Sequence, residues 1–250
     1  MPDKINHKKK IKWHIGCSGF HYKEWKEIFY PKGLATGKWF KYYTEHFDTM
    51  ESNVTFYRLP TQSMLKRWHD ESNEHFLFSV KGPRLVTHYK RFIDVDSAIK
   101  KFYDTIFEGL QEKIACVLFQ LPPKWNYTPE RLESIITALD PAFNNVLEFR
   151  DSSWWNQEVY DRLTEHSITF CGISHPTLPD TVVRTSSIYY FRFHGTPKMF
   201  YSSYDHKYLD GIIKKIKRLK HIEQAYIYFN NTAGPAAIEN ADYLKQQLNQ

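Results

Sequence analysis

The chain of 250 residues is 42% hydrophobic and 17% aromatic and carries a net charge of +6. Its length and apolar content suit a single domain with one large core, since no Gly/Ser-rich or Pro-rich linker divides the sequence. No apolar stretch approaches the roughly 20 residues that span a bilayer, and the N-terminal segment lacks the apolar region of a signal peptide. We therefore expect a cytoplasmic protein with no membrane partner.

The positive charge is concentrated in two short segments. Lysines dominate residues 1–12, and a second basic run covers residues 207–220. We expect a basic N-terminal tail over residues 1–12, followed by a single domain over residues 13–250. Because these segments do not indicate one contiguous basic face, the sequence favours nucleic acid as a partner less than a small molecule.

Eight short apolar runs, rich in β-branched and aromatic residues, predict buried strands. They begin at Lys12, Phe47, Phe76, Ala115, Asn145, Ile168, Tyr189 and Ala225. The cysteines, Cys17, Cys116 and Cys171, fall within these runs and have no spacing typical of a metal site. We expect them to be buried, reduced thiols.

Amphipathic helical patterns separate most of these runs. They cover residues 37–47, 62–71, 95–110, 129–139, 156–166, 205–219 and 235–248. Thr61 and Thr128 are in position to cap the helices that follow them, and Pro129 suits a first helical turn. The stretch from His175 to Ser187 has no helical period and contains two prolines, which predicts an irregular connection.

Strands that alternate with helices are typical of βαβ units around a parallel sheet. Eight such units in 250 residues match the usual size of a (β/α)8 TIM-type barrel, about 250 residues. We therefore predict an α/β fold of this type, irregular around the sixth crossover. Any active site would lie at the carboxyl ends of the strands.

Polar side chains lie at the ends of most of the predicted strands. The candidates are Glu51, Lys81, Gln120, Glu148, Arg150, Arg192, His194, Asn230 and Asn231, with Tyr57 on an adjoining loop. An unpaired charge in an apolar run is costly, so these groups are expected to be either paired or functional. The structural alternative is a plug of salt bridges, in which Glu51 pairs with Arg192 or Glu148 pairs with Lys81.

The favoured interpretation is an enzyme that acts on an anionic small molecule, such as a phosphorylated one. The cationic candidates outnumber the two glutamates, which favours an anionic ligand. Glu51, Glu148 and His194 are the candidate catalytic groups, with one glutamate as the general base. The other candidates would bind the substrate, and in such a functional site the loss of Arg192 would cost little stability. The reaction class stays open between hydrolysis and isomerisation.

Other sites and functions are also indicated, each by a narrower pattern. A phosphate site is expected near Gly195 and residues 232–236, where a helix follows the last strand. No cofactor is indicated, and a catalytic divalent metal is less favoured because neither HxH nor HExxH spacing occurs. A nucleic-acid-backbone binding protein or nuclease, and a non-catalytic binding module, remain as alternative functions.

Several segments resemble the YecE-like family, also catalogued as domain of unknown function 72. They are IGCSGFHYKEW from Ile15, ESNVTFYRLP from Glu51, FSVKGPRLVTH from Phe78, LFQLPP from Leu118, LEFRDSSWW from Leu147, FRFHG from Phe191 and YFNN from Tyr228. The resemblance implies a (β/α)8-type barrel and no established reaction. After the sixth strand, CGISH from Cys171 stands where the family commonly has an acidic residue, which argues against a mechanism that needs a carboxylate there.

Overall fold

A computed structural model describes residues 10–248, and the strands in that range form two parallel sheets. One sheet has four strands in the order β1-β9-β8-β7, and the other has five in the order β2-β3-β4-β5-β6. The strands are β1 (Lys12–Cys17), β2 (Thr49–Ser52), β3 (Leu77–Lys81), β4 (Ile114–Gln120), β5 (Asn145–Glu148), β6 (Thr169–Phe170), β7 (Gly172–Ser174), β8 (Ile188–Phe193) and β9 (Gln224–Phe229). The predicted α/β class is confirmed.

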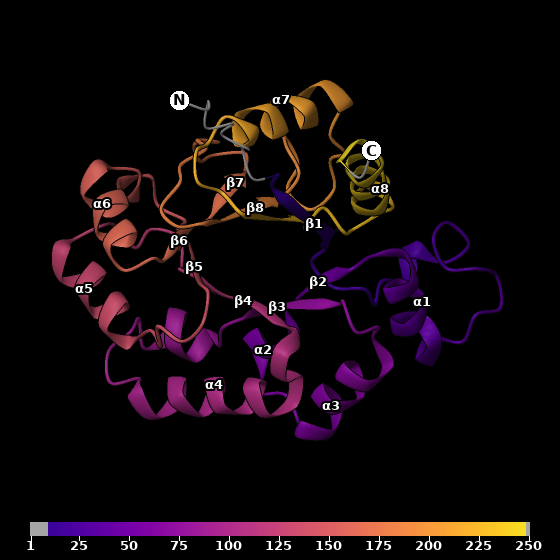
Figure 1. Cartoon of the computed structure of the whole chain (residues 1–250), viewed down its shortest axis with the longest axis horizontal. Helices are drawn as coiled ribbons and strands as arrows, with labels where there is room; N and C mark the ends of the chain where they lie inside the picture. The colour runs from indigo at the N-terminus through magenta and orange to yellow at the C-terminus, as the bar shows by residue number, and fades with distance from the viewer. Residues whose placement is uncertain (1–9, 249–250) are drawn as a thin grey trace, which may run out of the picture.

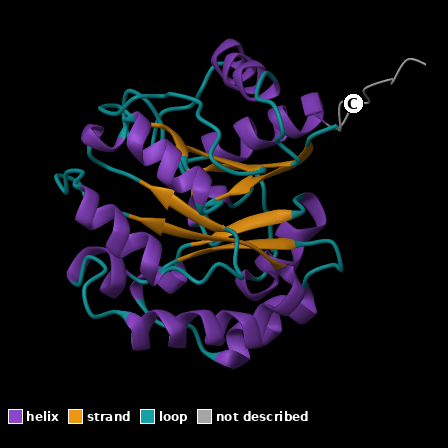
Figure 2. Ribbon diagram, turned by 60° about the vertical axis from the view of Figure 1, so that its left-hand side comes forward, coloured by secondary structure: helices purple, strands orange, loops and turns teal. Residues whose placement is uncertain are grey.

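Helices surround the strands on the outside of the molecule (Figure 1, Figure 2). The α-helices are α1 (Trp39–His46), α2 (Val54–Tyr57), α3 (Gln62–Glu71), α4 (Asp96–Leu110), α5 (Pro129–Ala138), α6 (Gln157–Glu165), α7 (His206–Lys217) and α8 (Ala236–Leu248). Short turns of 3₁₀-helix, η1 (Lys23–Trp25), η2 (Thr36–Lys38), η4 (Gln111–Lys113) and η5 (Ser152–Trp154), and a π-helix, η3 (Leu85–Tyr89), lie in the connections. None of the helices over residues 10–248 is long and apolar enough to cross a membrane.

Local sequence signals place the helix starts. Thr61 and Thr128 cap their helices by accepting hydrogen bonds from the backbone N–H groups of Met64 and Arg131, as predicted. The connection over residues 175–187 contains no helix, which confirms the irregular crossover. Residues 1–9 of the predicted basic tail lie outside the described residues, and Lys12 already belongs to β1.

The strands are buried on both faces, which explains their nearly continuous apolar sequences. Along β8, Tyr189 and Phe191 join the large core that includes helix residues, whereas Tyr190 joins a second core with Leu118 of β4 and Tyr228 of β9. Successive side chains of a strand point to opposite faces. The second core contains residues of both sheets, so the two sheets pack together through their inner faces.

The two sheets meet at two places. Cys171 separates β6 from β7, and its N–H donates to the carbonyl of Leu147 at 2.9 Å. Between β1 and β2, the Tyr43 hydroxyl accepts from the Cys17 N–H at 2.8 Å and donates to the Thr49 carbonyl at 3.1 Å. The strand hydrogen bonds thus form two sheets, not the single closed one that the sequence predicts.

Candidate active site at the carboxyl ends of the strands

Most of the predicted polar residues lie at the carboxyl ends of the strands. Lys81, Gln120 and Glu148 are the last residues of β3, β4 and β5. Since all the strands are parallel, these ends lie at one edge of each sheet. We refer to the group formed by Glu51, Lys81, Gln120, Glu148, Arg150, Arg192, His194 and Asn230 as the carboxyl-end cluster.

Arg192 bridges two buried glutamates from the other sheet. Its Nη2 is 2.6 Å from Glu51 Oε1, and its Nη1 is 2.5 Å from Glu148 Oε2. All three side chains are at most 1% exposed. The Glu51–Arg192 pair considered as a structural plug is therefore present, and a second glutamate shares the same guanidinium. We call this group the Arg192 bridge.

The Glu51 carboxylate has further hydrogen-bond donors besides Arg192. The Ser18 hydroxyl donates to Oε1 at 2.7 Å, and the Tyr190 hydroxyl donates to Oε2 at 2.6 Å. Ser18 follows β1 and Tyr190 lies on β8, so Glu51 of β2 links the five-stranded sheet to two strands of the other sheet. Each carboxylate oxygen is already an acceptor, which favours a positioning role for Glu51.

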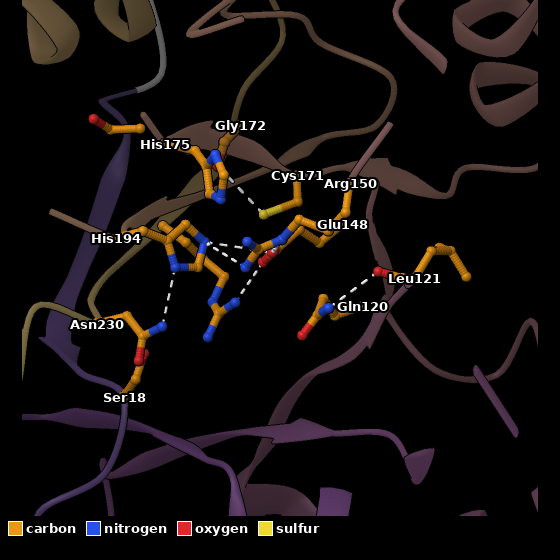
Figure 3. A network of polar contacts seen from close by, with 12 residues as sticks. Ser18, Gln120, Leu121, Glu148, Arg150, Cys171, Gly172, His175, His194 and Asn230 are labelled. Carbon is orange, nitrogen blue, oxygen red and sulfur yellow. Dashed lines mark hydrogen bonds and ion pairs between the residues drawn. The ribbon is translucent and has the colours of Figure 1, made fainter. Parts of the chain in front are cut away.

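Glu148 belongs to a second set of contacts that extends toward solvent (Figure 3). Its Oε1 accepts from Arg150 Nε and lies 3.4 Å from His194 Nε2. His194 Nε2 is also 3.1 Å from Arg150 Nη2, and its Nδ1 is 3.0 Å from Asn230 Nδ2. The Arg150 side chain is 12% exposed and His194 is fully buried. Arg150 therefore separates the buried part of the cluster from solvent.

Burial and neighbouring charges set the protonation states of this set. Burial acts to raise the pKa of Glu148, but the positive charges of Arg150 and Arg192 outweigh it and hold that pKa well below the usual value. Burial, followed by the charge of Arg150, lowers the pKa of His194 well below its usual value. Glu148 is thus ionised and His194 neutral near pH 7. An ionised carboxylate with so low a pKa is a weak base.

Lys81 differs from the other cations of the cluster because its amine is buried without a carboxylate partner. It forms no ion pair with any residue in the range 10–248 that the structure describes. Its Nζ donates to Gln120 Oε1 at 2.8 Å and lies 4.2 Å from the centre of the Phe56 ring. Burial, followed by the charge of Arg192, lowers the pKa of Lys81 from 10.5 to about 7.

Two predicted residues lie apart from the carboxyl-end cluster. Asn231 is buried, and its Nδ2 donates to Ser202 O at 3.0 Å and to Asn240 Oδ1 at 3.3 Å, so it holds a loop to α8. Tyr57 is 66% exposed and lines a groove of about 330 Å³ together with Phe56, Arg84 and other residues. Among the described residues, neither side chain forms a hydrogen bond, ion pair or ring contact with a member of the cluster.

Two backbone donors at the predicted phosphate site near Gly195 form hydrogen bonds within the protein. The Gly195 N–H donates to the Tyr204 hydroxyl at 2.7 Å, and that hydroxyl is 2.9 Å from Ser174 Oγ. The Ala233 N–H donates to the Phe200 carbonyl at 3.1 Å. These two donors are already used inside the fold, whereas an anion site needs donors that are free.

Comparison with known proteins identifies the relatives of this chain. The model for a protein family of unknown function, DUF72, matches residues 14–250. The chain belongs to the DUF72 family. The resemblance predicted from the sequence is confirmed, and the family description assigns no activity.

Relatives of this DUF72 protein share sequence and fold. The UPF0759 protein YunF of Bacillus subtilis is 25% identical over a match that covers 88% of this chain and 89% of YunF. YecE of Escherichia coli is 28% identical over 147 residues, and the match spans about half of YecE, 53%. A DUF72 protein from Thermotoga maritima has a TM-score of 0.87 at 26% identity, covering 96% of this chain and 100% of that protein. One from Enterococcus faecalis, with a TM-score of 0.80 at 18% identity, supports the fold alone.

His88 is a residue of this DUF72 protein that the sequence interpretation missed. It lies in η3, and its ring centre is 5.1 Å from that of Phe56, which covers the Lys81 amine. Burial, followed by the charge of Lys81, lowers the pKa of His88 to about 4. The imidazole is therefore neutral near pH 7 and, like the Glu148 carboxylate, a weak base. A π-helical turn often marks a functional site. No periodic sequence pattern predicts such a turn.

The cluster offers a metal ion few ligands. Among residues 10–248 no group of three or more His, Cys, Asp or Glu side chains is arranged to hold one. The oxygens of both glutamates are engaged by arginine, serine and tyrosine donors. The cysteines are free and buried, and burial raises the pKa of Cys116, with the thiols of Cys17 and Cys171 affected in the same way. They are expected to be inert thiols.

Proposed function

We propose that this DUF72 protein is an enzyme that acts on an anionic small molecule bound beside Lys81 and Arg150. The observation that carries the proposal is the Lys81 amine, which is 8% exposed and has no carboxylate partner among the described residues. A buried amine of this kind is destabilising unless a ligand or a reaction uses it. An anion beside it would supply the missing negative charge.

The charge distribution supports this position for the anion. Arg192 is used by two glutamates and is 1% exposed. Arg150 donates its Nε to Glu148 but remains 12% exposed, so its outer face is available to a ligand. With a pKa of about 7, Lys81 is protonated in part of the population near pH 7. In that form three cations face two carboxylates in the cluster, and a single anionic group would balance them.

We propose a division of roles that differs from the one expected from the sequence. Glu51 and Glu148 hold Arg192, Arg150 and the adjoining strands in position and do not exchange protons with the substrate. The amine of Lys81, with a pKa of about 7, is the group suited to accept a proton near pH 7. Gln120 would orient the Lys81 amine through its hydrogen bond of 2.8 Å.

The proposal includes the barrel arrangement itself. We propose that the two sheets act as one (β/α)8-type barrel, joined through Cys171 and through the Tyr43 hydroxyl. Hydrogen bonds that cross between the sheets support this arrangement, since Tyr228 of β9 bonds with Thr49 of β2 at 2.5 Å and with Ser79 of β3 at 2.9 Å. In such a barrel, the carboxyl ends of the strands are where active sites lie.

Calorimetry with simple anions tests the proposed binding site. Titration of the protein with phosphate, and separately with pyruvate, should give binding that weakens about 10–100-fold in Arg150→Gln, because a charge-assisted hydrogen bond contributes about 1.5–3 kcal/mol. Arg162→Gln is the matched control, since Arg162 forms an exposed ion pair with Glu133. Equal affinity in the wild type and Arg150→Gln would refute the proposed site.

A further inference from the structure

We infer that Lys81 is a nucleophile that forms an imine with a carbonyl-bearing anion. The substrate class is then an aldehyde or ketone that also carries a carboxylate or phosphate group. The inference rests on the proposed function, because the anionic group would be bound by Arg150 while the carbonyl carbon reaches the Lys81 amine. Beyond the proposed function, this inference identifies the reacting group of the substrate as a carbonyl and adds a covalent step.

The other buried lysine of the described chain provides the decisive contrast. Lys113 is 5% exposed, and its Nζ donates to His69 O at 2.7 Å, Ser72 O at 3.0 Å and Ser72 Oγ at 2.9 Å. An ammonium group has three donors, and here all three are used. Lys113 is thus a structural ammonium group, which has no lone pair with which to attack a carbonyl carbon.

Lys81 is similarly buried but has a different environment. Its Nζ has a single hydrogen-bond acceptor, Gln120 Oε1 at 2.8 Å. Burial contributes most to the lowered pKa of Lys81, followed by the charge of Arg192, whereas Glu148 and Glu51, each already paired with arginine, act in the opposite direction. A desolvated lysine beside other cations is an activated amine nucleophile.

The environment of Lys81 increases the fraction of its amine that is neutral and therefore reactive. The pKa of Lys81 is about 7, compared with 10.5 for an ordinary lysine. At pH 7 the fraction of neutral amine is therefore roughly a thousandfold larger than for an ordinary lysine. Only the neutral amine has the lone pair that attacks a carbonyl carbon.

The proposed step is balanced without a further reactant. The Nζ lone pair forms a bond to the carbonyl carbon while the C=O π electrons move to oxygen, which takes up a proton. That proton comes from the nitrogen, which gives a neutral carbinolamine. The second nitrogen proton passes to the hydroxyl group, which leaves as water when the C=N bond forms, so the products are a neutral imine and water.

The backbone around Lys81 is fixed in a way that suits this role. The Thr55 hydroxyl donates to the Lys81 carbonyl at 2.5 Å, which ties the end of β3 to α2. Phe56, the next residue of α2, lies over the amine at 4.2 Å. The side chain is thereby held between an apolar ring and an amide oxygen, so that little reorganisation is needed when a carbonyl group arrives.

Reductive trapping tests the inference directly. The wild-type protein would be incubated near pH 7 with glyoxylate and sodium cyanoborohydride, which transfers hydride to an imine carbon and leaves a stable secondary amine. Peptide mass mapping should find carboxymethylation at Lys81 far ahead of the exposed lysines, with Lys113 unmodified. The mapping uses the wild type, so it does not depend on whether a variant folds. Lys81→Met should lose the fast labelling, with thermal melts used to confirm its fold.

Parallel reactions distinguish this inference from the proposed anion site. Glycolaldehyde phosphate replaces the carboxylate by a phosphate, and glycolaldehyde carries no charge. Selective labelling of Lys81 by all three aldehydes, unaffected by Arg150→Gln, would support the imine while refuting the anion site. Anion binding by calorimetry without selective labelling of Lys81 would overturn the imine and leave the anion site standing. Labelling spread evenly over exposed lysines would also overturn it.

Discussion

The buried amine of Lys81 is central to the functional hypothesis, and its burial also lowers the stability of the folded protein. Its amine has one hydrogen-bond acceptor and no carboxylate partner among residues 10–248. A lysine that is ionised in water must lose its proton or remain charged in a buried site, and either outcome costs free energy on folding. Burial also lowers the pKa of Lys113, but its ammonium group donates to three oxygens that stabilise the charged form.

Replacement of Lys81 by Met should therefore stabilise the protein in a pH-dependent way. The pKa falls from 10.5 to about 7 on folding, so below pH 7 the full cost is present and roughly 3–5 kcal/mol of unfolding free energy should be gained. Between pH 7 and 10.5 the unfolded state binds more protons than the folded state, the wild type gains stability as the pH rises, and the difference should shrink. Urea denaturation across this pH range measures it.

Lys113→Met is the matched control for this experiment. Because its amine satisfies two backbone carbonyls and a hydroxyl, its loss should destabilise the protein at pH 7. A Lys81→Met variant that is less stable than the wild type at pH 7, or whose gain does not change with pH, would contradict the interpretation of Lys81 as an unpaired buried amine.

At the scale of the elements, the Arg192 bridge joins strands of different sheets. Arg192 belongs to β8, whereas Glu51 and Glu148 belong to β2 and β5 of the other sheet. The sequence-based expectation that Arg192 could be lost with little effect on stability assumed that its charge was repelled by neighbouring cations. In the structure its guanidinium is surrounded by carboxylates, and burial of those carboxylates depends on it.

We therefore predict that Arg192→Ala lowers the free energy of unfolding by about 3–5 kcal/mol, because two carboxylates would remain buried without their cation. Thermal or urea denaturation measures the loss. Arg162→Ala is the matched control, since its ion pairs are exposed and should contribute only about 0–1 kcal/mol. If the Arg192→Ala protein had the same melting temperature as the wild type, the Arg192 bridge would have no role in joining the sheets.

Much of the candidate site could be predicted at the level of strands and their alternation. Charged residues at the ends of apolar runs were grouped correctly at one edge of each sheet because parallel strands share a direction. The alternation of side chains could also have separated Asn230 from Asn231, since Tyr226 and Tyr228 share the face of Asn230. The junctions between the two sheets at Cys171 and Tyr43 depend on individual hydrogen bonds that no sequence pattern predicts.

Loop residues account for what the sequence interpretation missed. His88 and Phe56 lie in η3 and α2, elements of five and four residues that carry no amphipathic period. Their positions beside Lys81 depend on how these turns fold over the strand ends. Tyr57 was grouped with the site because it follows β2 closely, but neighbouring residues of a short helix point in different directions, and only Phe56 faces the amine.

At the scale of the whole molecule, the positive charge divides between two ends of the sheets. Helix α7 runs from the carboxyl end of β8 to the amino end of β9 in the outer layer of helices (Figure 1). Its last turn, with Lys214, Lys215 and Lys217, therefore lies toward the amino ends of the strands, opposite the carboxyl-end cluster. Cations at a helix C-terminus also stabilise the helix. The positive charge of this last turn is thus not directed at the candidate site.

This separation makes the nucleic-acid alternative testable with two variants. We predict that a labelled DNA duplex binds only in the non-specific range, Kd about 10⁻⁴–10⁻⁶ M, and that this binding falls steeply with salt. Fluorescence anisotropy should show a weaker complex for the double variant Lys214→Gln, Lys217→Gln, and an unchanged complex for Arg150→Gln, whereas calorimetry with phosphate should show the reverse. Loss of duplex binding in Arg150→Gln would place the nucleic acid at the carboxyl-end cluster and favour a nuclease over an enzyme for small anions.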